Sequence, residues 1–392
     1  MAEHSFRCPD CGEYPVNHKT EWVSALFDSV FMPVSGVFDR IAGAVFPSGA
    51  NHLFDGWSLA IFRAAAALRL GTLKSGPDGS DSARNRMVWE AARQRGIALW
   101  QFRVLGRPDG INFFVAQRRE KTILFEGLPR PGSGKSKSLD WMDNKATLKH
   151  KFTAAGIPMA RGRACFTFGG ALRTMRAVGV PVIAKPHIGS RSRHTTVDIA
   201  TPEALATAFH KANQLSPLVI IEQQLQGSLF RILLVAGKLT AVCRREPPHV
   251  VGDGVSTVRE LAVVANRDPR RAGPVYHTLP LDVPVDWSRV PAKGEMFNLD
   301  THVSRFYGGT TTDFTDRLHP DNRTLFEHIA EVLGDSLVGV DFIMGDMERS
   351  WRDQDRCGVI ECNSLPNIDL HQDVFSGENR DIAGMLFEQA FS

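Results

Sequence analysis

Residues 337–363 read LVGVDFIMGDMERSWRDQDRCGVIECN, and this stretch places acidic and amide side chains inside two apolar strands. Asp341 lies in the predicted strand LVGVDFIM, while Glu361 and Asn363 alternate along the predicted strand GVIECN. Alternate residues of a strand point to one face, so Glu361 and Asn363 are expected to lie side by side. Because a lone buried charge is costly, each acid either forms a structural ion pair or serves a function. The functional interpretation is a magnesium site, since Mg²⁺ prefers oxygen ligands.

Basic side chains nearer the N-terminus suit the phosphates of a nucleotide. Lys145 begins a helix predicted from about Asp143 to Ala155, and Lys185 ends the strand VPVIAKP before the basic loop HIGSRSRH. A lysine neutralises phosphate oxygens as a point charge, and backbone N–H groups of a loop can surround a triphosphate. Glu222 ends the strand LVIIE, where a carboxylate suits the edge of an adenine slot. Each lysine alone is explained as well by a solvated strand or helix end, and only the order of the set points to a nucleotide.

The order of predicted elements indicates an α/β protein with several β-layers. Strands alternate with helices from about residue 84 onwards, with helices predicted at 84–95, 203–214 and 321–333. Residues 19–73 are typical of two or more apolar helices. The turn-rich segment Ser75–Ser82 is the best linker candidate. Four parts are predicted: an N-terminal accessory segment (1–80), a small α/β domain (81–140) and two lobes (141–226 and 227–392).

Four stretches in a fixed order carry a resemblance to a known family. They are REPPHVVGDGVSTVRELAVVANRDPRR (245–271), GGTTTDFTDRLHPDNR (308–323), LVGVDFIM and VIECNSLPNIDLH. From about Ser138 to Gln389 the sequence resembles the ATP-grasp domain of cyanophycin synthetase, and it is less similar to the ATP-grasp half of bifunctional glutathione synthetases. The resemblance implies an ATP-grasp fold whose lobes clasp Mg-ATP. It also implies an ATP-dependent carboxylate–amine ligase that forms an amide bond through an acyl-phosphate and releases ADP and phosphate.

The same resemblance implies roles for individual residues. The implied ATP contacts are Lys145, Lys185, Gly189 and Arg193 for the phosphates, and Glu222 with the backbone of Gln223, Gln224 and Leu225 for adenine. The implied magnesium ligands are Asp341, Glu361 and Asn363. The candidate catalytic residues are Arg231, in contact with phosphate or substrate, His249, a base for the acceptor amine, and Arg305, a donor to the tetrahedral oxyanion.

The phosphate loop departs from the family's glycine-rich pattern. Ser192 and His194 stand where glycines are usual, which restricts the φ > 0 conformations open to the loop. Leu229 stands where the family has an acid placed to meet the ribose. The alternative to a ligase is therefore a nucleotide-binding regulatory or scaffolding module with weakened catalysis. No match to the C-terminal module of cyanophycin synthetase occurs before Ser392, so a stand-alone ligase making one kind of amide bond is expected.

Composition and charge indicate which classes of binding partner and which cellular compartment to expect. The 46 basic and 43 acidic side chains leave a net charge of +3, so no nucleic-acid partner is expected. The resemblance implies small-molecule substrates, a carboxylate and an amine from amino acids or peptides, and it favours a homo-oligomer. The six cysteines do not form a disulfide framework and the N-terminus lacks a signal peptide, so the cytoplasm is expected.

Residues 22–47 come nearest to a membrane segment. Asp28, Asp39 and Arg40 interrupt the apolar run, and Pro33 would kink a helix there. Core-packing helices are therefore expected, with a membrane- or partner-docked surface as the alternative.

The N-terminal residues contain a small set of metal-ligating side chains. His4, Cys8, Cys11 and His18 are spaced as H-x₃-C-x₂-C-x₆-H and offer four ligands for structural zinc. A single C-x-x-C is a weak signal, so unligated thiols are the alternative.

Overall fold

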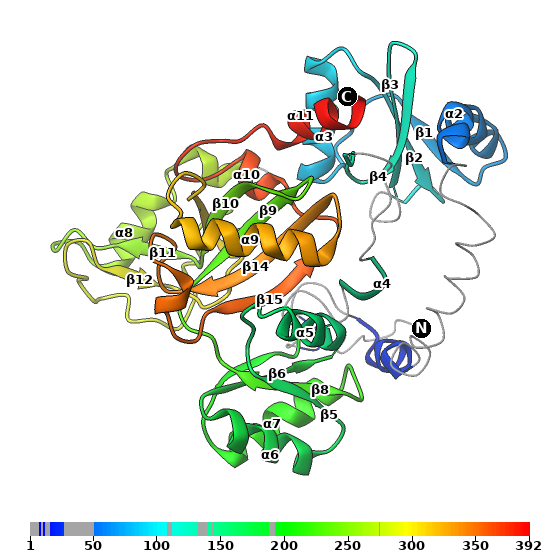
Figure 1. Ribbon diagram of the computed structural model, residues 1–392. Helices are drawn as coiled ribbons and strands as arrows, with labels where there is room; N and C mark the ends of the chain where they lie inside the picture. The colour runs from blue at the N-terminus through cyan, green and yellow to red at the C-terminus, as the bar shows by residue number, and fades with distance from the viewer. Residues whose placement is uncertain are drawn as a thin grey trace, which may run out of the picture.

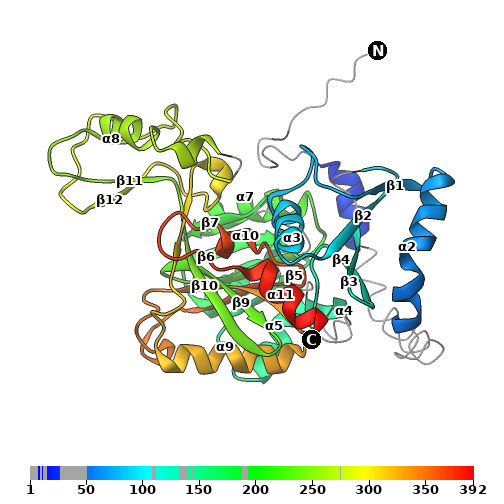
Figure 2. The same cartoon turned by 90° about the horizontal axis from the view of Figure 1, so that it is seen from above.

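The computed structural model describes residues 8, 11, 16–26, 51–107, 112–131, 139–142, 145–187, 193–273 and 275–392 of the 392-residue chain. These residues form a small α/β domain and two lobes, each built around its own antiparallel sheet (Figure 1). Helix α2 (Asn51–Ala67) of the small domain and helix α8 (Val258–Ala265) of the second lobe lie at opposite ends of the molecule (Figure 2).

The small domain is a four-stranded sheet in the order β1-β2-β3-β4 with helices on both faces. Its strands are β1 (Gly71–Lys74), β2 (Ala98–Val104), β3 (Asn112–Arg118) and β4 (Lys121–Glu126). Helix α2 covers one face, where Phe62 stacks on Phe102 with 4.6 Å between ring centroids. Helices α3 (Ala83–Gln94) and α11 (Ile382–Phe391) cover the other face, where Phe125 meets Phe387 at 6.0 Å. The C-terminal helix therefore completes a core whose sheet ends at Glu126.

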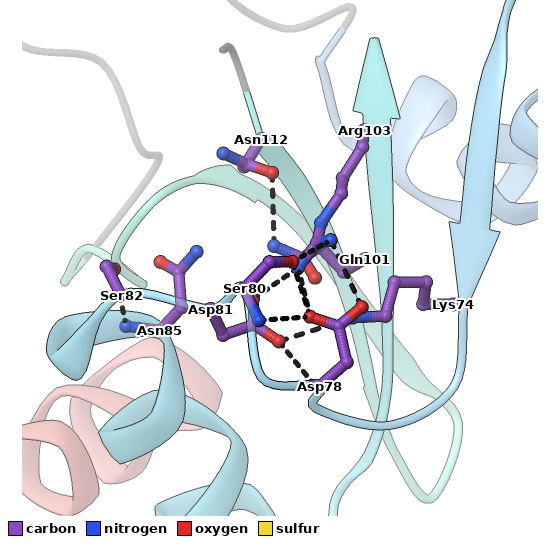
Figure 3. Close-up of polar contacts among 9 residues, drawn as sticks. All are labelled: Lys74, Asp78, Ser80, Asp81, Ser82, Asn85, Gln101, Arg103 and Asn112. Atoms are coloured by element: carbon purple, nitrogen blue, oxygen red, sulfur yellow. Dashed lines mark hydrogen bonds and ion pairs between the residues drawn. The ribbon is translucent and has the colours of Figure 1, made fainter. Parts of the chain in front are cut away.

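Charged side chains bind the turn after β1 to this sheet (Figure 3). The Arg103 guanidinium lies 2.7 Å from the Asp81 carboxylate and 3.2 Å from that of Asp78, and Lys74 Nζ lies 2.6 Å from Asp78. Burial acts to raise the pKa of Asp81, but bonds from the Asp78 N–H and from Arg103 outweigh burial and lower that pKa. We call Lys74, Asp78, Asp81 and Arg103 the small-domain charge network.

The segment Ser75–Ser82, predicted as a linker, connects two elements of one domain in the structure. β1 pairs with β2 from Gly71 opposite Val104 to Lys74 opposite Gln101. The predicted division at residues 80 and 81 separates these two paired strands. We propose that the domain boundary lies before α2, so that both α2 and β1 belong to the small domain.

The first lobe is a sheet in the order β5-β8-β6-β7 with two helices on one face. Its elements are β5 (Gly162–Cys165), α6 (Phe168–Val178), β6 (Val182–Pro186), β7 (Thr196–Ile199), α7 (Pro202–Asn213) and β8 (Val219–Gln223). Val182 and Ala184 of β6 pack with Leu205 and Ala208 of α7 in the lobe's core. Since strand residues alternate, Lys185 points to the other face of the sheet.

The second lobe is a five-stranded sheet in the order β13-β10-β9-β14-β15. Its strands are β9 (Ser228–Val235), β10 (Lys238–Glu246), β13 (Thr310–Asp313), β14 (Leu337–Met344) and β15 (Gly358–Asn363). Helices α9 (Pro320–Leu333) and α5 (Lys145–Ala154) pack on one face through Phe326 and Phe152. On the other face Leu233 and Leu337 join the core of the small domain. The rest of that second face carries polar side chains.

Shorter elements complete the lobes. They are α4 (Leu139–Met142), β11 (His249–Val251), β12 (Met296–Asn298), α10 (Asp369–Gln372) and the 3₁₀ helices Pro269–Ala272, Arg305–Tyr307 and Trp351–Asp353. Strands β11 and β12 pair and enclose a separate small core with α8 through Val250, Val258 and Leu299. Helix α8 begins with a capping box between Thr257 and Glu260, which satisfies backbone N–H groups at its first turn.

Most predicted elements are confirmed, including the helices at 84–95, 203–214 and 321–333 and the strands LVGVDFIM and GVIECN. Helix α6 has no counterpart among the predicted elements, because Gly169 and Gly170 weaken the helical propensity of its first turn. The helix forms with Thr167 as its N-cap, whose hydroxyl accepts from the Gly170 N–H.

The apolar stretch at 22–47 is described only in part. Residues 18–26 are helical, and residues 27–47 lie outside the described residues. In the part of the chain that the structure describes, the helices lack the length and apolar character that a membrane span requires.

Candidate functional site

A row of charged side chains crosses three strands of the second-lobe sheet. Arg231 of β9 lies directly opposite Asp341 of β14, and Asp341 lies directly opposite Glu361 of β15. Directly opposite residues share a face, so these side chains project together from the face that α9 leaves free. Asn363 follows Glu361 by two residues and projects from the same face. Strand pairing therefore brings the three predicted magnesium ligands together beside Arg231.

Arg231 and Asp341 form a buried ion pair. Arg231 Nε donates to Asp341 Oδ1 at 2.6 Å and Nη2 donates to Oδ2 at 3.0 Å. Burial acts to lower the pKa of Arg231, but the Asp341 carboxylate outweighs burial and raises it. Gly339 leaves the space that this guanidinium occupies, since a Cβ there would lie 2.9 Å from Arg231 Nη1.

Two further arginines lie near this pair, and with Arg231 they form what we call the arginine cluster. Arg245 Nη1 lies 3.7 Å from Asp341 Oδ2. Arg305 forms an ion pair with Asp369. Burial lowers the pKa of both Arg245 and Arg305, so neighbouring acids compensate these charges only in part. A cluster of this kind suits an anionic ligand such as a phosphate or a carboxylate.

Two uncharged side chains adjoin the arginine cluster. Cys243 of β10 lies opposite Arg231, and burial raises the pKa of its thiol to about 12 despite the nearby arginines. The thiol is therefore protonated and is not a nucleophile at neutral pH. His371 of α10 is 1% exposed, and burial together with the charges of Arg231 and Arg305 lowers its pKa to about 3. Among the described residues neither ring nitrogen of His371 has a hydrogen-bond partner, so a neutral donor and acceptor are left for a ligand.

A second polar surface lies on the first-lobe sheet, on the face opposite α6 and α7. Glu222 of β8 is bound there by Lys149 of α5, at 2.6 Å, and by Lys185 of β6. Burial acts to raise the pKa of Glu222, but the two lysines outweigh burial and lower it. A cavity of about 290 Å³ on this face is lined by Lys149, Gly162 and Ile220 among others. The carboxylate predicted at an adenine slot is therefore held between two ammonium groups.

The segment Gln223–Leu225 leads from this surface to the second lobe. The Gln223 N–H donates to the Arg161 carbonyl at 2.7 Å, and the Gln224 N–H donates to the Pro181 carbonyl at 3.1 Å. These two N–H groups are engaged within the protein. Gly227 follows with φ of 122°, and a Cβ there would lie 2.2 Å from the backbone of Met344, so only glycine fits where the lobes join.

Comparison with curated proteins identifies similar sequences. The cyanophycin synthetase of Nostoc sp. is 31% identical over 263 residues, which cover 64% of this chain and 29% of that protein. The cyanophycin synthetase of Synechocystis sp. is 31% identical over 252 residues, with 60% and 29% covered. A bifunctional glutathione biosynthesis protein of Mannheimia succiniciproducens is 27% identical over 281 residues, with 63% and 36% covered. The chain thus spans under a third of the length of these cyanophycin synthetases. No family model matches it.

Among solved structures, a bifunctional glutathione synthetase from Pasteurella multocida matches with a TM-score of 0.59 and 22% identity, over 78% of this chain and 44% of that one. This chain has the ATP-grasp fold. The predicted α/β fold class is therefore confirmed. One polar surface lies on each sheet of the ATP-grasp fold, and residues 223–227 connect the two.

The second-lobe row of the ATP-grasp fold fits magnesium. Two carboxylates and an amide form a donor set that Mg²⁺ accepts. Asp341 keeps acceptor capacity while it binds Arg231, because an ionised carboxylate has about four lone-pair sites. Asn363 Nδ2 is buried without a hydrogen-bond partner among the described residues, so this amide nitrogen is not committed to a structural hydrogen bond.

For four other predicted residues the structure does not establish a place in either polar surface. Lys145 begins α5, but its side chain is not among the described ones, and Gly189 lies outside the described residues. Arg193 is half-buried just before β7. His249 begins β11, and its Nδ1 lies 2.9 Å from the Pro247 carbonyl, which is a local contact. The roles of these four residues stay predictions.

Two residues of the polar surfaces are absent from the predicted set. Lys149 follows Lys145 by one helical turn, and this i, i+4 spacing is the signal that would have indicated a shared helix face. His371 ends the stretch VIECNSLPNIDLH that carries the family resemblance.

Proposed function

We propose that this chain is an ATP-dependent carboxylate–amine ligase that forms an amide bond on amino-acid or peptide-like substrates through an acyl-phosphate. The observation that carries the proposal is the arginine cluster beside Asp341, Glu361 and Asn363 on one face of the second-lobe sheet. Similarity to proteins named as cyanophycin and glutathione synthetases supports it.

The chemistry requires a good leaving group on the donor acid. A carboxylate oxygen leaves poorly, so the γ-phosphoryl group of ATP is transferred to it and ADP departs. The amine then attacks the carbonyl carbon, the C–O bond to phosphate breaks, and the amine loses a proton. Phosphoryl transfer depends on positioning and charge neutralisation more than on covalent catalysis by the protein. The protonated thiol of Cys243 agrees with a mechanism that uses no cysteine nucleophile.

The residues of the two surfaces have distinct proposed roles. The arginine cluster binds the transferred phosphoryl group or the donor carboxylate, as bidentate guanidinium groups do. Lys185 and Lys145 bind the phosphates of ATP. Lys185 does so while its ammonium group also remains paired with Glu222. Asp341, Glu361 and Asn363 hold magnesium, which neutralises phosphate charge when bound. Neutral His371 positions the substrate by hydrogen bonding.

The decisive experiment supplies ATP, Mg²⁺ and a panel of amino acids and short peptides, and measures ADP release. We expect ADP formation to require both a carboxylate and an amine, and an ¹⁸O label in the carboxylate to appear in phosphate. Glu361→Gln should lose this turnover, while Glu331→Gln, at an exposed position on α9, should retain it. Release of AMP and pyrophosphate would contradict the acyl-phosphate route.

A nucleotide-binding regulatory module is the second candidate function. It is favoured by the internal pairing of Glu222 with two lysines and of Asp341 with Arg231, which leaves fewer free charges for catalysis. ATP binding by calorimetry without ADP release on the full substrate panel would establish it over the ligase.

The cellular compartment and the oligomeric state of the protein are also proposals. All six cysteines are free thiols in the structure, which supports a reducing cytoplasm. A homo-oligomer is proposed from the family resemblance, and sedimentation velocity at several protein concentrations tests it.

A further inference from the structure

Four metal-ligating side chains from two distant parts of the chain converge in the structure. They are Cys8, Cys11, His18 and His194, and their ligand atoms all lie within 4.8 Å of one another. Cys11 and His194 are buried, at 4% and 1% exposed. None of the four side chains has a role in the proposed reaction, and Arg193, a predicted phosphate contact, directly precedes His194 in the sequence.

The distances within the cluster are those of ligands around one small cation. His194 Nε2 lies 3.5 Å from Cys8 Sγ and 3.4 Å from Cys11 Sγ, and His18 Nε2 lies 3.2 Å from Cys11 Sγ. Zinc bonds of about 2.3 Å to sulfur and about 2.0 Å to nitrogen at a tetrahedral angle place the two ligand atoms about 3.5 Å apart. The histidine rings stand edge to face at 84°, with both Nε2 atoms directed to the sulfurs.

His194 is oriented as a metal ligand should be. Its Nδ1 lies 2.8 Å from the Lys211 carbonyl, which can only accept, so Nδ1 carries the proton and the lone pair of Nε2 is directed to the sulfurs of Cys8 and Cys11. Metal-bound histidines commonly donate their second nitrogen to a carbonyl in this way. His194 also has φ of 52°, in the left-handed region that costs free energy for a residue with a Cβ.

We propose that Cys8, Cys11, His18 and His194 bind one structural zinc ion that fastens the N-terminal segment to the first lobe. Two thiolates and two imidazoles form a closed tetrahedral set with no position for substrate, which is typical of structural rather than catalytic zinc. His194 takes the place that the sequence assigns to His4, which lies outside the described residues. The zinc joins Cys8, Cys11 and His18 to His194, which lies two residues before β7.

The first test is the metal content of the full chain purified without chelators. We expect about one zinc per chain, which is lost in His194→Ala and in Cys11→Ser. The matched controls are His328→Ala, an exposed histidine on α9, and Cys357→Ser, a buried cysteine of the second lobe. Both controls should keep the zinc. A wild-type chain that neither carries nor takes up zinc would overturn the proposal, as would full zinc in His194→Ala.

The second test needs no variant and therefore does not depend on mutant folding. X-ray absorption at the zinc edge of the wild-type chain should show two sulfur and two nitrogen neighbours, at about 2.3 Å and about 2.0 Å. A shell of oxygen and nitrogen alone would place the metal elsewhere and refute the assignment. The readout is independent of ATP turnover, so failure of the ligase proposal leaves it unaffected.

Discussion

The small-domain charge network and the arginine cluster with its acids are similar in composition, since each combines buried arginines with carboxylates. In the small-domain network the Arg103 guanidinium lies 2.7 Å and 3.2 Å from two carboxylates, and the pKa of Asp81 is lowered. In the arginine cluster Arg245 has its nearest carboxylate oxygen 3.7 Å away, and its pKa is lowered by burial.

The two networks differ in how far their charges are compensated within the protein. The Asp81 carboxylate is bound by the Asp78 N–H, by Arg103 and by Lys74, and its pKa is lowered, so the small-domain network is complete within the protein. Burial lowers the pKa of Arg245 despite the nearby acids, and we propose that an anionic ligand completes the arginine cluster. Burial of an arginine therefore does not by itself distinguish a structural network from a binding site. What distinguishes them is how far nearby acids compensate the charge of the arginine.

The largest expected effect is on stability in the small domain. Arg103→Met should lower the free energy of unfolding by about 3 kcal/mol, because buried Asp81 loses its guanidinium partner and keeps only Lys74, at 3.2 Å, and the Asp78 N–H. Urea unfolding followed by circular dichroism measures this, and turnover per folded molecule should be unchanged. A loss below 1 kcal/mol would mean that the charges of this network do not stabilise the fold by compensating one another.

The next effect is on catalysis in the second lobe. Glu361→Gln should lower kcat by about 10²–10³-fold, because it removes a charge from the proposed magnesium site. Its unfolding free energy should stay close to wild type. Full turnover with unchanged magnesium dependence would remove Glu361 from the site.

A smaller effect is expected from substitution of Arg245, whose charge the nearby acids compensate only in part. Arg245→Gln should lower kcat/KM by about 10–100-fold, the value of one charge-assisted hydrogen bond to an anion. It should change the unfolding free energy by less than about 1 kcal/mol. Arg244→Gln is the matched control, because Arg244 is the next residue of β10, faces the other way and pairs with Glu246 at 2.6 Å. Equal losses in both variants would contradict the special role of Arg245.

The smallest effect is a pH dependence of stability. The folded pKa of Asp81 lies below its unfolded value of about 4, so its contribution is present above that pH and is lost as the pH falls through the folded pKa. Unfolding free energies measured between pH 5 and pH 2 should therefore decrease, and less steeply in Asp81→Asn. An identical slope in this variant would show that Asp81 does not titrate in that range.

Strand periodicity made part of the site predictable. Glu361 and Asn363 are two apart on one strand, and the pairing of β14 with β15 then sets Asp341 beside them. The contact of Lys149 with Glu222 was not predictable in this way, because it depends on how α5 packs between two lobes. The same holds for His371, whose burial and position near Arg231 follow from tertiary packing.

The cluster of Cys8, Cys11, His18 and His194 shows most clearly what the sequence alone could not predict. The local spacing identified Cys8, Cys11 and His18, but it indicated His4 as their partner. His194 belongs to the first lobe, far away in the sequence, and only tertiary packing brings its Nε2 to the sulfurs of Cys8 and Cys11.

Helix α11 has a consequence for the order in which the chain folds on the ribosome. The sheet of the small domain is complete at Glu126, yet Phe125 packs against Phe387 of the last helix. Domains usually fold as they emerge, N-terminal first. Here α3 covers the part of this face around Phe114, but the part around Phe125 stays uncovered until both lobes and α11 have been synthesised. Truncated or stalled chains would therefore present this face to chaperones, whereas the finished protein buries it.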